Sequence, residues 1–190
     1  MKQRIAQFIF KCIGWKTNGF PEGVKKALLI VMPHTSNWDF PLGILLRTAI
    51  GKKILYLGKS SLFKWPYGAL FRWLGGYPVY RDQRLNFVQT VAEIFHKHEE
   101  FLVVLAPEGT RQKVDQLKTG FYYMALEAKV PLVMTSFDWD NKEANFSAPY
   151  ELIGDYEQDL KVIEAHYKGI RRKIPENGYL YEMWLNDKFY

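Results

Sequence analysis

The sequence contains one cysteine, Cys12, so no disulfide can form within the chain. Small secreted domains that depend on disulfides carry several cysteines, and a lone one favours a reducing compartment. Internal repeats, low-complexity tracts and linkers are also absent from the 190 residues. A chain of this length predicts a single domain, residues 1–190, with a hydrophobic core of its own.

Long apolar runs are missing as well. The longest uninterrupted runs, such as residues 27–32 and 101–106, are six residues long, far short of the roughly 20 residues of a membrane-spanning helix. The N-terminus is basic with a short apolar patch, but it has no small-residue cleavage site before Lys16, which excludes a signal peptide. We therefore expect no transmembrane helix.

Charge and aromatic content are the features present in excess. Lysine and arginine number 26 against 20 acidic residues, which gives a net charge of +6 and favours an anionic partner. Nucleic acid, a phospholipid surface and a phosphorylated substrate all fit that charge. Aromatic residues make up 16% of the chain, which suits a protein that meets an amphipathic phase because Trp and Tyr have one polar and one apolar end.

Apolar segments alternate with amphipathic ones along the chain. The expected strands cover residues 27–32, 53–57, 77–80, 101–106, 130–137 and 145–152. The expected helices cover residues 40–50, 62–74, 86–98, 120–129 and 155–170, and the aromatic tail 178–190 is expected to dock as an irregular helix. This alternation predicts an α/β fold in which a mostly parallel sheet is flanked by helices. Residues 27–137 form its motif-bearing core and residues 155–190 a C-terminal helical segment.

Residues 1–16 predict an amphipathic N-terminal helix. Its apolar stripe is Met1, Ile5, Phe8, Ile9 and Cys12, with basic residues on either side. Such a stripe either packs on the domain or lies on an anionic membrane, and the two are compatible.

Two helix starts carry capping signals. Ser36 or Asn37 is placed to cap the helix after the first strand, so Ser36 is interpreted as a cap rather than a nucleophile. Asp155 with Gln158 three residues on resembles a capping box.

Three polar stretches follow or include predicted strands: His34–Asp39, Gly76–Arg81 and Pro107–Arg111. The carboxyl ends of parallel strands meet at one edge of a sheet, where α/β proteins place their chemistry. The first and third stretches should therefore share one crevice, with Arg81 and Lys118 as candidates to reach it.

The residue types at this crevice fit the activation of a hydroxyl group. His34 can accept a proton from an alcohol, and Asp39 can orient its imidazole. No Gly-x-Ser-x-Gly motif is present, so the nucleophile should come from the substrate. Arg81, Arg111 and Lys118 suit a phosphate group.

Simpler explanations exist for each signal alone. Glu108 could pair with Arg111 in an ordinary turn, and Arg81 could be a solvated surface residue. The three remaining histidines, His96, His98 and His166, lie in predicted helices without the spacing of metal ligands and are interpreted as structural, so no metal site is expected.

Taken in order, these stretches resemble the four sequence blocks of the glycerolipid acyltransferase family, which includes the lysophosphatidate acyltransferases. The blocks are His34 to Asp39, Gly76 to Arg81, Pro107 to Arg111, and Val130 to Val133. The resemblance extends from about Leu28 to Phe137, more than half of the chain.

The resemblance implies transfer of a fatty acyl group from acyl-CoA or acyl-ACP to a lysophospholipid hydroxyl, most simply 1-acylglycerol-3-phosphate giving phosphatidate. It implies His34 as the general base and Asp39 as its orienting group. The implied acceptor-binding residues are Arg81, Glu108, Gly109, Thr110 and Arg111, with Lys118 added from its charge, and Pro131 would serve the acyl side. No cofactor is implied beyond the thioester co-substrate.

The implied partners are the lysophospholipid, the acyl donor, an anionic membrane surface and, for one donor type, acyl carrier protein. We expect a cytoplasmic protein that is peripheral on the inner face of the cell membrane and binds no nucleic acid. Two alternatives stay open: the same chemistry on an amino-acid lipid, a glycolipid or another lysophospholipid, or a basic nucleic-acid-binding domain.

Overall fold

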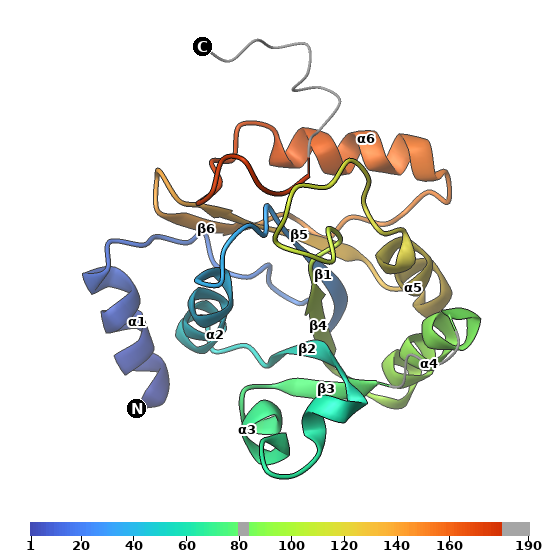
Figure 1. Ribbon diagram of the computed structural model, residues 1–190, viewed down its shortest axis with the longest axis horizontal. Coiled ribbons are helices and arrows are strands. Elements are labelled where there is room, and N and C mark those ends of the chain that lie inside the picture. The colour runs from blue at the N-terminus through green and yellow to red at the C-terminus, as the bar shows by residue number, and fades with distance from the viewer. Residues whose placement is uncertain (80–83, 180–190) are drawn as a thin grey trace.

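A six-stranded sheet forms the centre of the molecule (Figure 1). The computed structural model describes residues 1–79 and 84–179. The strand order is β3-β2-β4-β1-β5-β6, and every neighbouring pair is parallel except β5 and β6. The sequence prediction of a single α/β domain with a mostly parallel sheet is confirmed.

The strands are β1 (Lys26–Met32), β2 (Ile54–Lys59), β3 (Gly76–Val79), β4 (Phe101–Leu105), β5 (Leu132–Asp138) and β6 (Glu143–Phe146). The helices are α1 (Lys2–Cys12), α2 (Asp39–Ala49), α3 (Gly68–Trp73), α4 (Arg84–Lys97), α5 (Gly120–Ala128) and α6 (Tyr156–Tyr167), and a short 3-10 turn η1 covers Ser60–Phe63.

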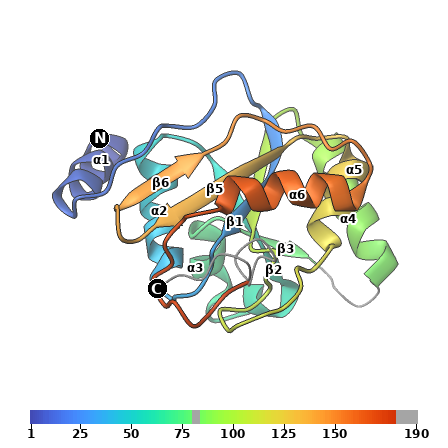
Figure 2. The same ribbon diagram turned by 90° about the horizontal axis from the view of Figure 1, so that it is seen from above.

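Helices cover both faces of the sheet (Figures 1 and 2). Helices α4, α5 and α6 enclose one core, in which Phe95, Tyr122 and Tyr167 are almost completely buried. Helices α1 and α2 enclose the other, around Leu29 and Val133. Because the central strands are buried on both faces, nearly all their side chains are apolar, which explains the continuous apolar runs in the sequence.

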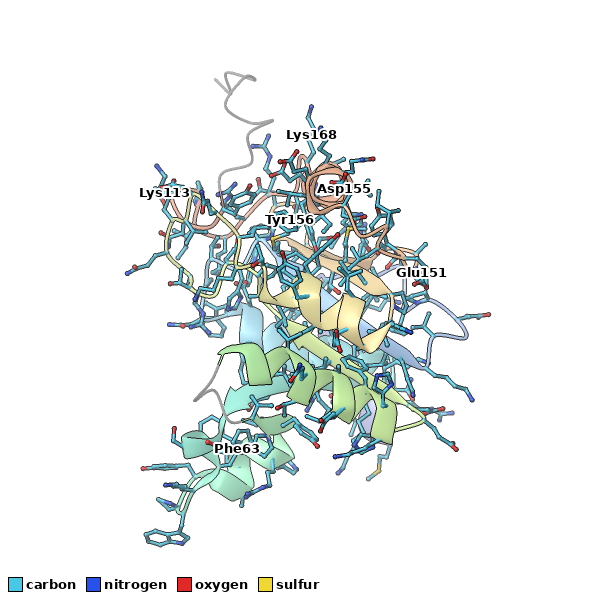
Figure 3. All side chains as sticks on the ribbon, turned by 90° about the vertical axis from the view of Figure 1, so that its right-hand side faces the viewer. Phe63, Lys113, Glu151, Asp155, Tyr156 and Lys168 are labelled. Atoms are coloured by element: carbon cyan, nitrogen blue, oxygen red, sulfur yellow. The ribbon has the colours of Figure 1, made fainter. Side chains whose placement is uncertain are left out.

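Two expected elements differ from the structure. The expected strand 145–152 is instead β6, and among residues 147–152 only Tyr150 forms a further bridge, to Leu132. The expected helix 62–74 is split into η1 and α3 because Pro66 lies between them and lacks the amide hydrogen that a continuous helix needs. Phe63, at the end of η1, lies beside α3 (Figure 3).

The capping prediction is half correct. Asp155 accepts hydrogen bonds from the amides of Glu157 and Gln158, as expected, at the end of α6 that faces the viewer in Figure 3. Helix α2 instead begins after Trp38, without a side-chain cap. Ser36 and Asn37 are too early in the chain to cap it, and the Ser36 hydroxyl accepts from the amide of Trp38 instead.

The predicted apolar stripe of the N-terminal helix faces outwards. Helix α1 packs on α2 through Ala6 and Phe10, and Gln7 Nε2 donates to the carbonyl oxygen of Ala49 at 2.9 Å. Ile5 and Phe8 are 52% and 69% exposed. The helix therefore does pack on the domain, but by a face other than the stripe.

No helix within the described ranges combines the length and apolarity that crossing a bilayer demands. The expected irregular helix at 178–190 lies outside the described residues from residue 180 onwards.

Candidate active site

Two polar turns meet at the carboxyl edge of the sheet, as the sequence predicts. Strands β1 and β4 are parallel neighbours with Ile30 opposite Leu105. The turn after β1 carries His34, and the turn after β4 carries Glu108. The amide of His34 donates a 2.8 Å hydrogen bond to Glu108 Oε2, which ties the two turns together.

His34 and Asp39 lie side by side across the first turn. The imidazole Nδ1 is 3.1 Å from Asp39 Oδ2, an ion-pair distance at which the two groups are not aligned as a hydrogen bond. The carboxylate is almost fully buried, whereas the imidazole is 17% exposed. With Nδ1 facing the carboxylate, Nε2 is the nitrogen left to take a proton from a substrate.

The Asp39 carboxylate is held by two further donors. Oδ2 accepts from the amide of Ser36 at 2.9 Å, and Oδ1 accepts from the indole Nε1 of Trp139 at 3.0 Å. Trp139 follows directly after β5, so a distant part of the chain fixes the carboxylate beside His34. A buried carboxylate needs such donors, because burial without them is costly.

Glu108 is buried, and its carboxylate accepts hydrogen bonds from two backbone amides. Its side chain is 1% exposed, and its second oxygen, Oε1, accepts from the amide of Tyr179 at 3.2 Å. Burial raises the pKa of the Glu108 carboxyl, and the hydrogen bonds from His34 and Tyr179 only partly offset that effect. These contacts differ from the simple pair with Arg111 that the turn suggested.

The segment after α6 closes over the two turns. The guanidinium of Arg172 donates to the carbonyl oxygen of Asn177 at 2.6 Å, and Thr35 Oγ1 accepts from the amide of Ile174 at 3.3 Å. Gly178 has a φ of 86°, and a side chain on it would meet Thr35 and Glu108, so glycine permits this close approach. The backbone of the turn that carries His34 is thus supported by residues far along the chain.

An apolar cavity of about 180 Å³ opens beside His34, between α2 and the sheet. His34 and Asp39 lie in its wall. The remaining lining is mostly aliphatic and aromatic and comes from α2, β1, β2, β4, β5 and β6. Gly43 in the middle of α2 leaves space there that a larger side chain would take.

A polar groove lies on the other side of the same turn. It is lined by residues of both turns and of the segment after α6: Thr35, Ser36, Asn37, Trp38, Thr110, Arg111, Gln112, Lys173 and Ile174. The Lys173 ammonium lies 3.8 Å from the centre of the Trp139 ring, a cation–π contact. Arg111 and Lys173 give the groove two cations, while Lys113 of the same loop points away from the sheet (Figure 3).

Three predicted site residues lie elsewhere or outside the described ranges. Lys118 packs against Gly109, whose φ of 67° suits glycine, and so lies beside the third block. Pro131 precedes β5, and its carbonyl oxygen accepts a hydrogen bond from the amide of Leu28. Leu28 lies four residues before Met32, the last residue of β1, so Pro131 is about 13 Å from the carboxyl edge of the sheet where the two turns meet. The structure does not bring Pro131 to the cavity or the groove, and Arg81 falls outside the described residues.

Two residues with direct contacts at the site are absent from the sequence prediction: Trp139 and Lys173. Both lie beyond the fourth block, and neither carries a local pattern that points to the site. No group of three or more His, Cys, Asp or Glu side chains suited to a metal ion occurs within residues 1–79 and 84–179.

Comparisons with known proteins agree with this geometry. The model of the family described as Acyltransferase matches residues 16–137. Among solved structures, the chain is similar to the crystal structure of the 1-acyl-sn-glycerophosphate (LPA) acyltransferase PlsC from Thermotoga maritima. The TM-score is 0.62 and the identity 18%, over 87% of this chain and 75% of that one, so the likeness shows a shared fold. A search of curated proteins gave no match.

Proposed function

We propose a specific reaction for this chain, which belongs to the acyltransferase family: transfer of a fatty acyl group from a thioester to a hydroxyl of a lysophospholipid. The acceptor that fits best is 1-acylglycerol-3-phosphate, and the product is then phosphatidate. Family membership replaces the alternative of a nucleic-acid-binding domain.

The turn that carries His34 borders two unlike spaces, and this carries the proposal. His34 itself lines an apolar cavity, and the residues that follow it, Thr35 to Trp38, line a groove with two cations. A reaction that joins an acyl chain to a phosphate-bearing headgroup needs both spaces within reach of one base.

His34 acts as the general base in this proposal. Its Nε2 takes the proton of the acceptor hydroxyl as that oxygen attacks the thioester carbonyl carbon, and the leaving thiolate takes the proton back. Asp39 stabilises the imidazolium that forms between these two steps. The chemistry as proposed requires no metal ion and no cofactor other than the thioester co-substrate.

The groove cations hold the acceptor's phosphate. Arg111 can grip two phosphate oxygens at once, and Lys173 adds a point charge that Trp139 holds in place. Thr110 contributes a hydroxyl to the same groove. Glu108 and Gly109 shape the loop, Lys118 packs against it, and Arg81 is proposed to reach the headgroup from the second block.

An anionic membrane surface is the proposed source of the acceptor. The outward stripe of α1, with Ile5 and Phe8, is flanked by lysine and arginine, as in helices that lie in a lipid interface. A second exposed aromatic group follows β2: Trp65 is 93% and Trp73 75% exposed. Such a protein would bind to the inner face of the cell membrane.

An assay of the purified protein with a panel of lysolipids tests the proposal. Acyl-CoA and acyl carrier protein thioesters are offered in turn, and products are read by lipid mass spectrometry. We expect acylation of 1-acylglycerol-3-phosphate, and we expect H34A to lose roughly 10²–10⁴-fold in kcat while its thermal melt stays near wild type. Full activity of H34A would refute the general-base role, and a preference for a phosphate-free lysolipid would refute the acceptor.

A further inference from the structure

Thr135 carries a buried hydroxyl that nothing in the described structure satisfies. The residue is 4% exposed, and Oγ1 has no hydrogen-bond partner among residues 1–79 and 84–179. Folded proteins pair nearly all of their buried hydroxyls, because an unpaired one costs free energy. A hydroxyl kept in this state points to a partner that arrives with the substrate.

Its position is next to the reacting groups. Thr135 lies in the middle of β5, opposite Val31 of β1. Its neighbours at alternate positions, Val133 and Phe137, face the core under α2, so Thr135 faces the same way. It lines the apolar cavity together with His34 and Asp39.

Apart from His34, whose imidazole is assigned to proton transfer, the other polar side chains of the cavity wall are engaged. Asp39 accepts from Ser36 and Trp139, and Arg47 donates to the carbonyl oxygen of Ile54 at 2.7 Å. Tyr56 donates its hydroxyl to a backbone carbonyl at 3.4 Å. Of the described polar groups that line this cavity, Thr135 is therefore the one whose O–H proton is unused by the protein.

We propose that the Thr135 hydroxyl donates a hydrogen bond to the carbonyl oxygen of the acyl thioester and stabilises the oxyanion formed during transfer. This inference rests on the proposed function. When the acceptor oxygen forms its bond to the carbonyl carbon, the C=O electron pair moves onto oxygen, and Thr135 faces that charge. The pair then returns, the C–S bond breaks, and the thiolate takes the proton that His34 holds.

The surroundings make such a donor effective. The oxyanion appears in a cavity with apolar walls, where water is largely excluded and one hydrogen bond counts for more than in solution. Residue 135 is held on a central strand, and its β-branched side chain has few rotamers, so little reorganisation is needed. The substrate's carbonyl oxygen also satisfies the unpaired hydroxyl.

Thr135→Val and Thr135→Ser separate the hydroxyl from the shape of the side chain. Valine matches threonine in volume without the O–H, and serine keeps the O–H. We expect T135V to lose about 10²–10³-fold in kcat, the usual effect of removing one oxyanion donor, with little change in KM. We expect T135S to stay within about tenfold of wild type, since it retains the donor.

The thermal melt gives a second readout. Because valine removes an unpaired buried hydroxyl, T135V should melt a few degrees above wild type, roughly 2–4 °C. Thr48→Val on α2 is the matched control. Thr48 is not among the residues that line the cavity, and its hydroxyl donates to the carbonyl oxygen of Ile44, so the change should leave kcat unchanged. A less active but more stable T135V is the combination that a purely structural role would not produce.

Two results would overturn the inference. Wild-type kcat in T135V, or a rise in KM alone, would show that the hydroxyl does not act on the oxyanion, while the acyltransferase proposal would stand. Absence of transfer by the wild-type protein with every donor and lysolipid would remove both.

Discussion

Replacing Trp139 by phenylalanine removes the hydrogen bond from its indole to the Asp39 carboxylate but keeps an aromatic ring at this position. The indole Nε1 donates to Asp39 Oδ1 at 3.0 Å, and Asp39 is 3% exposed. Phenylalanine keeps an aromatic ring against Trp15 and under the Lys173 ammonium, but it has no donor. Oδ1 would then lie buried without the partner that it has in the wild type.

The size of the effect follows from that loss. A hydrogen bond to a charged group is worth about 1.5–3 kcal/mol when its partner is left buried. If the whole loss adds to the activation free energy of the step in which His34 becomes imidazolium, kcat falls about 10- to 150-fold, since each 1.36 kcal/mol is tenfold in rate. If the same loss lowers the free energy of unfolding, the melting temperature falls by roughly 3–12 °C for a chain of this size.

Trp15→Phe is the matched control for this experiment. Trp15 is equally part of the core under α2 and contacts the rings of Phe10, Phe137 and Trp139, but it has no hydrogen bond to Asp39. Steady-state kinetics and thermal melts of both variants separate packing from positioning. We expect W139F to lose kcat with KM nearly unchanged and W15F to lose stability alone. Equal kcat in the two variants would refute the positioning role of Trp139.

Three further changes test other parts of the site. Gly43→Ala should raise the free energy of unfolding by about 0.5–1 kcal/mol, because the new methyl group meets only ordinary contact with Phe137. Gly43→Leu should shift donor preference to shorter acyl chains, and an unchanged preference in G43L would argue against the cavity as the acyl site. Glu108 has a raised pKa, so its contribution to stability is complete below its unfolded pKa of about 4.3 and is lost as the pH rises through the folded pKa. Between pH 4 and 7 the melting temperature of the wild type should therefore fall relative to that of E108Q. Parallel melting curves of the two proteins would contradict this. Phe8→Asp on α1 should weaken sedimentation with anionic vesicles while leaving activity on micellar substrate unchanged, and unaltered vesicle binding would exclude α1 as the lipid contact.

Local patterns were sufficient to predict the sheet and the proximity of His34 and Asp39. The apolar runs at 27–32 and 101–106 correspond to β1 and β4, and their parallel pairing brings the turns after them together. His34 and Asp39 belong to one turn, so their 3.1 Å approach depends mainly on local chain geometry. Short-range spacing is informative in such cases because few arrangements of the chain are possible.

Contacts between distant segments could not be predicted in this way. Trp139 is 100 residues from Asp39, and Tyr179 is 71 residues from Glu108. Their role depends on how β5 and the segment after α6 return to the edge of the sheet. The helix-cap prediction at Ser36 was wrong for a different, local reason: the helix starts only at Asp39, and the Ser36 hydroxyl accepts from the amide of Trp38 before the helix begins.

The hydrogen bond from Tyr179 to Glu108 has a consequence for co-translational folding of the enzyme. Glu108 holds the amide of His34, and Glu108 itself is held by residue 179. A nascent chain that has exposed the whole family-matched region, 16–137, still lacks Trp139 and Tyr179. Synthesis must proceed past residue 179 before His34 and Asp39 acquire all these supports, so activity should not appear before that segment has been made.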